Sequence, residues 1–483
     1  MPIDLTKSLA WKQARAEELK LLENLQGNIL KGHGRHFTAN LFLKFGADKA
    51  VSRRLLRELA NYHLTSAHRQ LLDAEKFKKE KDGGGAFCHL ALSFAGYKAL
   101  GLQAKAPQDG DFTKGMSHKD SLHDLSDPPV AKWDPEFPAE PHAMLLCAHD
   151  SESETAALAR EMRKLAEEAG CSVWIQHGKA LFNAKRDGIE HFGYVDGRSQ
   201  PLMLQEDIDE EAAKAGIANW NPTFGLDIAL IEDPGVVDKD HPKESCGSFF
   251  VFRKLEQNVQ EFKHREQLIA DAMHLKGEAR ELVGALLVGR FENGTPVTMA
   301  GEAVDREPLN DFNYEGDSGT RCPLHAHIRK TNPRGTGGQE KEPQERKHLM
   351  PRRGIPYEDV KRKVHPNELA EADTLDEFKA SVLPNLPTGG VGLLFMAYNA
   401  SIGLQFKVAQ QAWANDTGFP KKPPGPHGID PVIGQGPNKP GDQKLPSKWD
   451  DPTAPTPHSF SGHVTMKGGE YFFSPSLRFL KTM

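Results

Sequence analysis

The first regular pattern in the chain is an alternation of apolar and polar residues. Residues 37–45 (FTANLFLKF) place an apolar side chain at every second position, which is typical of a strand with one buried face. Leucines then recur at helical spacing over 55–59, and a second alternating run covers 88–94. The pattern predicts a strand, a helix and a second strand.

The same order repeats further along the chain. MLLCA at 144–148 is typical of a buried strand, and a helix is expected to open near Ser153 and to end at Gly170. Extended structure resumes at 172–176 (SVWIQ). Two short strand-helix-strand units in succession favour a ferredoxin-like sheet over a long doubly wound one.

The second half begins comparably, with a strand at 248–255 followed by two helical stretches within 257–289. An apolar strand at 391–398, a helix around Gln410 and a final strand at 470–474 complete it. We interpret the second half as an elaborated copy of the first.

The pattern therefore predicts an α+β fold of two ferredoxin-like domains, residues 1–235 and 236–483, with antiparallel sheets and peripheral helices. Two segments interrupt it, the polar, Gly-rich 332–347 and the Pro-rich 418–457. Loops of this length inside a compact domain are usually functional or wrap over the surface, so we do not interpret them as interdomain linkers.

Charge and composition exclude several classes of protein. The 483 residues carry 61 Lys and Arg against 67 Asp and Glu, a net charge of −6, which gives no broad basic field for nucleic acid. No stretch approaches 18 consecutive apolar residues, and the first 30 residues have no signal-like apolar run. We expect neither a nucleic-acid partner nor a membrane span.

The five cysteines are widely spread, odd in number and without a CxxC pair. This distribution disfavours both a disulfide framework and a structural zinc site. It fits a reducing compartment, so we expect a cytoplasmic protein.

The first segment whose residues could take part in catalysis or binding is HFGYVDGRSQP at 191–201, where Asp196 lies between Val195 and Gly197. Gly193 and Gly197 permit backbone conformations and close approaches that side chains would block. A tight turn capped by the aspartate is the alternative interpretation of this segment alone.

The second segment is RCPLHAHIRKTNPRG at 321–335, which holds His325 and His327. Two histidines spaced by two point the same way on a strand, so a metal-binding pair is possible. Two further ligands at a recognisable spacing are absent from the sequence. The two histidines alone are therefore weak evidence for a metal site.

Two more segments complete the set of candidates. Arg352 and Arg353 are adjacent in HLMPRRGIPY, and at most one of two neighbouring extended residues can face a pocket. Leu393 and Phe395 share one face of the apolar strand at 391–398, which would be a plain core strand if considered alone.

Taken in this order, the segments resemble the dye-decolorizing peroxidases, a family of haem enzymes, and in length the larger bacterial and fungal subgroups of that family. The resemblance spans nearly the whole chain. Its motifs are QGNILKGHG (26–34), GYVDG (193–197), AHIRKTNPR (326–334), RRG (352–354), the GLLF strand, GIDPVIG (428–434) and GGEYFFSPS (468–476).

The resemblance implies that His327, not His325, is the axial ligand of the iron of haem b, and that the C-terminal domain binds most of the haem. An axial imidazole is usually oriented by an acceptor at its other nitrogen, and Asp430 occupies that position of the family pattern. Arg334 matches a partner for a haem propionate.

On the opposite side of the haem, the resemblance places Asp196 and Arg352. Arg352 would stabilise hydroperoxide and the charge on the departing oxygen, while Asp196 would shuttle a proton between the two oxygens. Leu393 and Phe395 would form an apolar lid that limits access to molecules of the size of peroxide. Which of the two positions, the aspartate or the arginine, contributes more to the reaction differs between members of the family, so the roles of Asp196 and Arg352 relative to each other stay open.

The implied enzyme reduces hydrogen peroxide and oxidises dyes, phenols or other one-electron donors through an oxoferryl intermediate. Because bulky dyes cannot enter so small a pocket, an oxidisable surface aromatic is expected, with Trp413 and Tyr398 as candidates. The physiological reductant, oxidation of Mn(II) and the choice between monomer and dimer stay open.

Two alternatives compete with this interpretation. One is a haem-binding or haem-handling protein with only incidental peroxidase activity. The other is a haem-free metal-binding or interaction protein built on His325 and His327.

Overall fold

The computed structural model describes residues 3–80, 84–135, 137, 140–236, 242–305, 310–366, 372–453 and 455–483. Its centre is a nine-stranded sheet in which β4, β1, β3, β2, β13, β8, β10 and β9 follow one another and β7 pairs with β8. Every pairing in this sheet is antiparallel. The strands are β1 (Phe37–Lys44), β2 (Phe87–Ser93), β3 (Ala143–His149), β4 (Ser172–Lys179), β7 (Ile231–Glu232), β8 (Cys246–Gln257), β9 (Ile355–Glu358), β10 (Val391–Asn399) and β13 (Val464–Ser474).

The two halves of the sheet have the same strand order. When the strands of each half are numbered along the chain, β4-β1-β3-β2 and β13-β8-β10-β9 both become 4-1-3-2. This agreement confirms the prediction of two ferredoxin-like copies. The halves join where Phe472 and Phe473 of β13 pair with Ser93 and Leu92 of β2.

The outer strands of the two halves also meet. At Gly178 of β4 an added side chain would come within 2.7 Å of Ile355 of β9. The sheet therefore curls until its two ends approach each other. The division at residue 235 stays a prediction, because the sheet runs through both halves without a break.

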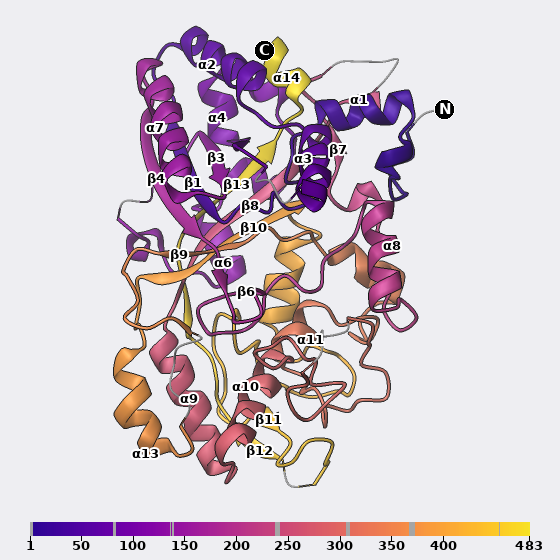
Figure 1. The fold of residues 1–483 in the computed structure, drawn as a ribbon, viewed down its shortest axis with the longest axis vertical. Coiled ribbons are helices and arrows are strands. Elements are labelled where there is room, and N and C mark those ends of the chain that lie inside the picture. Colours follow the sequence, from indigo (N-terminus) through magenta and orange to yellow (C-terminus); the bar gives the residue numbers. More distant parts are fainter. Residues whose placement is uncertain are drawn as a thin grey trace.

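Helices cover the sheet at both ends of the molecule (Figure 1). The larger helices of the first half, α2, α3 and α7, lie at one end with both chain termini, and α9, α10 and α13 lie at the other. The helices are α1 (Ala16–Asn24), α2 (Lys49–Tyr62), α3 (Ala67–Glu80), α4 (Phe94–Ala99), α5 (Gly110–Lys114), α6 (Lys119–Leu125), α7 (Glu152–Glu168), α8 (Gln205–Lys214), α9 (Val259–Ala272), α10 (Glu281–Val288), α11 (His327–Thr331), α12 (Glu342–Glu345), α13 (Leu375–Glu377) and α14 (Leu477–Thr482).

Local sequence accounts for several helix boundaries. The Asp48 carboxylate accepts hydrogen bonds from the backbone N–H groups of Ala50 and Val51 and so caps the start of α2. The Ser151 hydroxyl caps α7 in the same way. The leucines of α2 that recur at helical spacing are buried against the sheet.

Some predicted elements differ in detail. Two helices, α2 and α3, connect β1 to β2 where one was expected, and Phe94 opens α4 instead of ending the strand. The expected helix around Gln410 is a single wide π-helical segment, Val408–Ala414. The segment 332–347 is not wholly irregular, since it contains α12.

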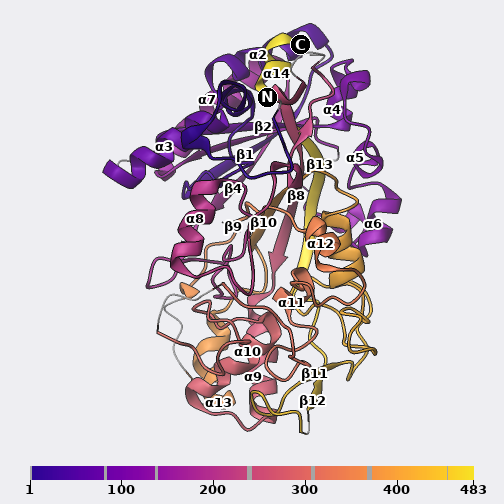
Figure 2. The same ribbon diagram turned by 90° about the vertical axis from the view of Figure 1, so that its right-hand side faces the viewer.

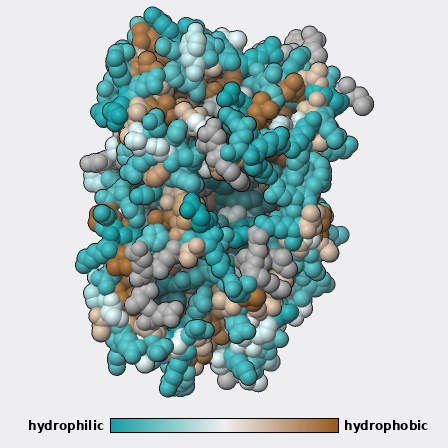
Figure 3. Space-filling view, viewed as in Figure 1, coloured by the Kyte–Doolittle hydropathy of each residue, from teal (hydrophilic) through white to brown (hydrophobic). Residues whose placement is uncertain are grey.

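The remaining strands form two small ribbons, β5 (Leu181–Phe182) with β6 (Gly188–Ile189) and β11 (Gln443–Leu445) with β12 (Thr456–His458). All five cysteines are buried free thiols. None of the helices in the described ranges has both the length and the apolar character needed to cross a bilayer. The face in Figure 3 is mostly hydrophilic, with apolar residues scattered singly or in small groups.

Candidate active site

His327 and Asp430 form a hydrogen-bonded pair, although 103 residues separate them. His327 is the first residue of α11, and its Nδ1 lies 2.8 Å from Oδ2 of Asp430. Oδ1 of Asp430 accepts hydrogen bonds from the backbone N–H groups of Val432 and Ile433, at 2.7 and 3.0 Å. Because both carboxylate oxygens act as acceptors, Nδ1 of His327 carries the hydrogen, and the lone pair of Nε2 is left to bind a metal.

Burial and charge act in opposite directions on His327. Burial disfavours the charged imidazolium, but the carboxylate of Asp430 outweighs this effect, so the pKa of His327 is raised. Asp430 itself is completely buried, whereas the side chain of His327 is 26% exposed. The imidazole is therefore fixed on one edge and open on the other.

His325 does not join His327. The chain enters α11 at His327, so the two residues do not lie on a strand, and the His325 ring packs 5.1 Å from the ring of His458. Burial lowers the pKa of His325 well below its usual value. In the described parts of the chain, no three or more side chains are arranged to hold a metal ion. The interpretation of His325 and His327 as a metal-binding pair on one strand is therefore wrong.

Asp196 projects from a turn built by two glycines. Gly193 (φ 103°) and Gly197 (φ 74°) adopt backbone conformations that glycine tolerates best. The Asp196 N–H donates to the carbonyl of Gly188 at 3.0 Å, and its Oδ1 accepts from the Gly197 N–H at 2.6 Å. The expected aspartate-capped turn is thus present, and the side chain remains exposed.

A buried carboxylate anchors the start of this turn. Glu190 accepts hydrogen bonds from the N–H groups of Phe192 (2.9 Å) and Tyr194 (3.0 Å), and burial raises its pKa to about 7. The Val195 N–H donates to the carbonyl of Glu292, which ties the turn to the second half of the chain. Both anchors fix the backbone that carries Asp196.

Arg352 is held by the segment that follows the same turn. Its backbone N–H donates to Oε1 of Gln200 at 2.9 Å, and its guanidinium donates to the carbonyl of Ser199 at 2.8 Å. Burial lowers the pKa of Arg352, and the negative charge of Asp196 acts against that shift. Both charges also act on the pKa of His327, so Asp196 and Arg352 lie near His327.

Arg353 has different partners from Arg352, as expected of an adjacent extended residue. Its guanidinium donates to the carbonyls of Asn28 (2.8 Å) and Ile29 (2.9 Å). Only Arg352 can therefore take part in chemistry beside His327.

Leu393 and Phe395 form the less covered face of β10. Their neighbours Leu394 and Met396 are buried, whereas Leu393 and Phe395 are half-buried, although β10 lies between β8 and β9 within the sheet. Half-buried apolar side chains on an interior strand line a space inside the fold. Leu393 also lies within 3.5 Å of the Cβ position of Gly354, two residues beyond Arg352.

Arg334 is buried and stacks 3.8 Å from the ring of Phe312. Its guanidinium donates to the carbonyl of Asn310 (2.7 Å), to the carbonyl of Phe312 and to the Asn310 side chain (2.8 Å). Burial lowers its pKa to about 9. Among the residues that the structure describes, no carboxylate lies within ion-pair distance of this guanidinium.

Sequence reasoning missed Arg290, which shares Asn310 with Arg334. Its guanidinium lies 3.0 Å from Oδ1 of Asn310, and burial lowers its pKa to about 10. The signal that could have revealed it is an arginine two residues after the apolar helix α10. Two buried cations side by side form a site for an acidic group.

Trp413 and Tyr398 are not surface residues. Trp413 is 3% exposed and stacks on Phe419, and Tyr398 is completely buried in β10. The prediction that either ring meets donors at the surface is wrong, because loops and neighbouring strands cover both. Trp413 instead packs behind α11, where its carbonyl accepts a hydrogen bond from the buried Lys330.

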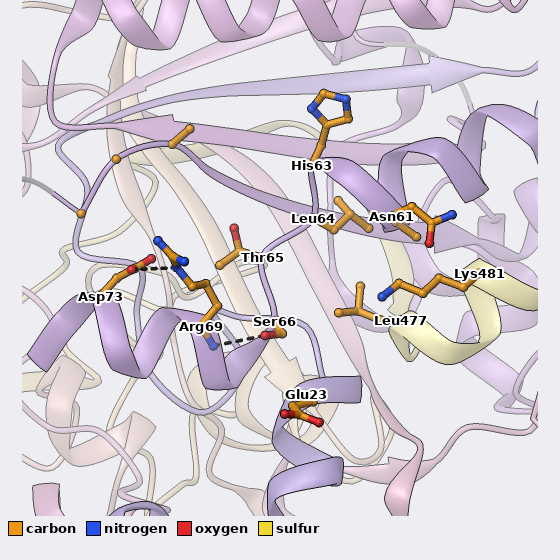
Figure 4. Close-up of a pocket in the computed structure, with 14 residues that line it drawn as sticks. Glu23, Asn61, His63, Leu64, Thr65, Ser66, Arg69, Asp73, Leu477 and Lys481 are labelled. Atoms are coloured by element: carbon orange, nitrogen blue, oxygen red, sulfur yellow. Dashed lines mark hydrogen bonds and ion pairs between the residues drawn. The ribbon is translucent and has the colours of Figure 1, made fainter. Parts of the chain in front are cut away.

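These residues fit a haem. His327 offers an imidazole nitrogen, Leu393 and Phe395 offer an apolar wall, and the buried cations Arg334 and Arg290 suit propionates. The hollow drawn in Figure 4 is a different place: it encloses about 390 Å³ between α1, α3 and α14, at the end of the molecule remote from α11.

Comparison with known proteins gives consistent results. No family model matches the chain. The multifunctional dye peroxidase DyP2 of Amycolatopsis sp. is 44% identical over 100% of both chains, and peroxidase 2 of Mycetinis scorodonius is 30% identical over 94% of this chain and 86% of its own length.

Solved structures agree with the sequence matches. The structure of DyP2 from Amycolatopsis sp. has a TM-score of 0.91 at 43% identity and covers 100% of both chains. A DyP-type peroxidase from Anabaena sp. has a TM-score of 0.87 at 34% identity and covers 98% of this chain and 97% of its own. Sequence and fold are thus similar over their whole length to these proteins.

Proposed function

This chain belongs to the dye-decolorizing peroxidase family of haem-dependent enzymes, and from that premise we propose how its own residues divide the peroxidase reaction. The enzyme acts on hydrogen peroxide with small-molecule donors. The observations that carry the proposal are the hydrogen-bonded His327–Asp430 pair and the nearness of Asp196 and Arg352, whose charges act on His327. We propose haem b as the cofactor.

On the proximal side, Nε2 of His327 would hold the iron. Haem, when bound, supplies the electrons that reduce peroxide. Asp430 keeps the hydrogen on Nδ1, fixes the orientation of the ring and raises its basicity. Arg334 and Arg290 would hold the propionates, because both are buried cations that donate to Oδ1 of Asn310 and neither has a carboxylate within ion-pair distance among the described residues.

On the distal side, Arg352 stabilises negative charge and Asp196 transfers a proton. Arg352 stays cationic and stabilises hydroperoxide and the negative charge on the departing oxygen. Asp196 accepts the proton that peroxide loses and returns it to the departing oxygen, which then leaves as water. Leu393 and Phe395 exclude bulky molecules, so large donors would be oxidised from outside the pocket.

The substitution Arg352→Leu tests this assignment, with Arg353→Leu as the matched control one residue away. We expect Arg352→Leu to slow the reaction with peroxide by about 10²–10³-fold, because one preorganised donor to the developing charge is lost. Stopped-flow absorbance of the haem-loaded variants measures the rate, and the Soret band checks that haem is retained.

The control should react with peroxide at close to the wild-type rate, since Arg353 faces Asn28 and Ile29. Equal rates in wild type and Arg352→Leu would contradict the proposed role. Loss of haem from Arg352→Leu alone would instead make Arg352 a haem-binding residue.

A further inference from the structure

Lys330 is a buried lysine that is held by backbone carbonyls. It is 0% exposed, and its Nζ donates to the carbonyls of Trp413 (3.2 Å) and Asp416 (2.6 Å). Among the described residues, no carboxylate lies within ion-pair distance of this ammonium group. Two other buried lysines, Lys254 and Lys263, each contact two carboxylates. The surroundings of Lys330 therefore differ from those of an ordinary buried ion pair.

Stability alone does not account for a lysine at this position. Taking an ammonium group out of water is costly, and an apolar side chain of similar shape would fill the same space without that cost. Burial lowers the pKa of Lys330 to about 8, and the negative charges of Asp430 and Asp416 act against that shift. Since the effect of Asp430 is the larger of the two, Lys330 lies near the carboxylate that holds His327.

Lys330 begins on the same side of α11 as His327. The two residues are three positions apart in the helix, and side chains with this spacing are neighbours on one face. Helix α11 packs against the π-helical segment Val408–Ala414. The last carbonyls of a helical segment lack partners within it, and Lys330 supplies one for Trp413. The side chain thus joins α11 to residues 413–416.

Residues 414–417 in turn hold the loop that leads to Asp430. The backbone N–H of Asp430 donates to the carbonyl of Ala414 at 2.8 Å. The N–H groups of His427 and Gly428 donate to the carbonyl of Thr417, at 2.6 and 3.2 Å. The backbone that carries Asp430 is therefore fastened to the stretch of chain that Lys330 holds.

We propose that Lys330 is a positioning residue for the proximal pair. Along α11, His327 is followed by Lys330, which binds residues 413–416. The carbonyl of Ala414 in that segment holds Asp430, and the carboxylate of Asp430 returns to Nδ1 of His327. These contacts form a closed circuit, which fixes the carboxylate at hydrogen-bond distance from the imidazole.

This role acts on the reaction without contact with peroxide or donor. A carboxylate held behind the imidazole fixes the orientation of the ring and raises the basicity of its other nitrogen. Lys330 maintains that arrangement from the side of the chain that carries Asp430. The inference rests on the proposed function, because it takes His327 as the axial ligand of the iron.

The substitution Lys330→Met tests the proposal, because methionine fills the space but donates no hydrogen bond. We expect the bond between Asp430 and His327 to loosen, so the iron–histidine stretching band should move to lower wavenumber. Resonance Raman spectra of the reduced, haem-loaded full chain measure this band. Haem should also transfer to an apoglobin about tenfold faster than from wild type. A band at the wild-type position would overturn the proposal.

The matched control is Lys421→Met. Lys421 pairs with the carboxylate of Asp416, so its loss removes a positive charge beside the same segment and leaves the carbonyls bound to Lys330. We expect the control to keep the wild-type band and rate of haem transfer. An equal shift in Lys421→Met would show that loss of charge, and not the position of Asp430, moves the band, and the proposal would be wrong.

A double variant separates positioning through Asp430 from a merely structural role. If Lys330 acts through Asp430, adding Lys330→Met to Asp430→Asn should leave the band and the transfer rate where Asp430→Asn alone puts them. Additive changes would contradict the proposal. If Lys330→Met does not fold, Lys330→Gln, whose amide can donate to one carbonyl, replaces it, and the same two outcomes decide.

The wild-type spectrum distinguishes this inference from the proposed function. If the wild type shows no iron–histidine band, His327 is not the axial ligand, and both proposals are wrong. If the wild type shows the band and Lys330→Met leaves it unmoved, only the positioning role of Lys330 is wrong.

Discussion

The proximal and distal sides of the site are held by different means. On the proximal side, His327 bonds directly to the carboxylate of Asp430, which is itself fixed by two backbone N–H groups. On the distal side, Arg352 is held by a carbonyl and an amide side chain. Among the described residues, the Asp196 carboxylate accepts a hydrogen bond from the neighbouring Gly197 N–H alone.

This difference fits the proposed tasks. A metal ligand needs its lone pair aimed in one direction, which a buried acceptor behind the ring provides. A proton carrier needs a carboxylate that can gain and lose a proton, and a tight ion pair with Arg352 would hold it in the charged form. The described structure contains no ion pair between Asp196 and Arg352, and the Asp196 side chain is exposed.

The largest effect is expected from the loss of the proximal nitrogen. His327→Ala removes the proposed axial ligand, so we expect the Soret band and the peroxidase activity to disappear together. Absorbance spectra of the purified protein measure the Soret band, and steady-state oxidation of a dye measures the peroxidase activity. His325→Gln is the control and should keep both, since His325 packs against His458. Normal haem content in His327→Ala would contradict the assignment.

A smaller proximal effect is expected when the ligand stays but its partner changes. In Asp430→Asn, one oxygen replaces two, so either His327 or the N–H groups of Val432 and Ile433 lose an acceptor. We expect haem affinity or activity to fall about 10–100-fold. Transfer of haem to an apoglobin measures the affinity.

Asp416→Asn is the control for this change, because Asp416 pairs with Lys421 and does not contact His327. Equal haem transfer rates in wild type and Asp430→Asn would show that the buried carboxylate does not tune the ligand.

The smallest effect is expected on the distal side, from a residue that only positions Arg352. Gln200→Leu removes the acceptor of the Arg352 backbone N–H. Loss of one hydrogen bond costs about 1 kcal/mol, which corresponds to a rate with peroxide about fivefold lower. Stopped-flow kinetics measure the rate of the reaction with peroxide, and the haem content of the variant is the control. A hundredfold lower rate would show that the distal side depends on single contacts as strongly as the proximal side does.

Pattern and motif predicted different parts of this molecule. Alternation located β1 and an apolar run located β10. Residues on both faces of β1 are buried, so its alternation records the type of side chain and not its exposure. The contact between His327 and Asp430 could not come from periodicity, since the two residues are 103 positions apart, and only the family resemblance paired them.

The errors have physical reasons. The helix that starts at His327 has five residues, too few to show a helical period, so the sequence leaves open a strand on which His325 and His327 would point the same way. Tyr398 was correctly placed on a strand, but a strand pattern cannot tell how many layers cover each face, and its ring is completely buried.

The position of β13 has a consequence for the order of folding. This strand, drawn in yellow beside β8 in Figure 2, occupies the middle of the sheet between β8 and β2. It spans Val464–Ser474 and follows the other described strands of this sheet in the sequence. Strands β2 and β8 are therefore synthesised before the strand that joins them, and the two halves of the sheet cannot close until β13 has been translated.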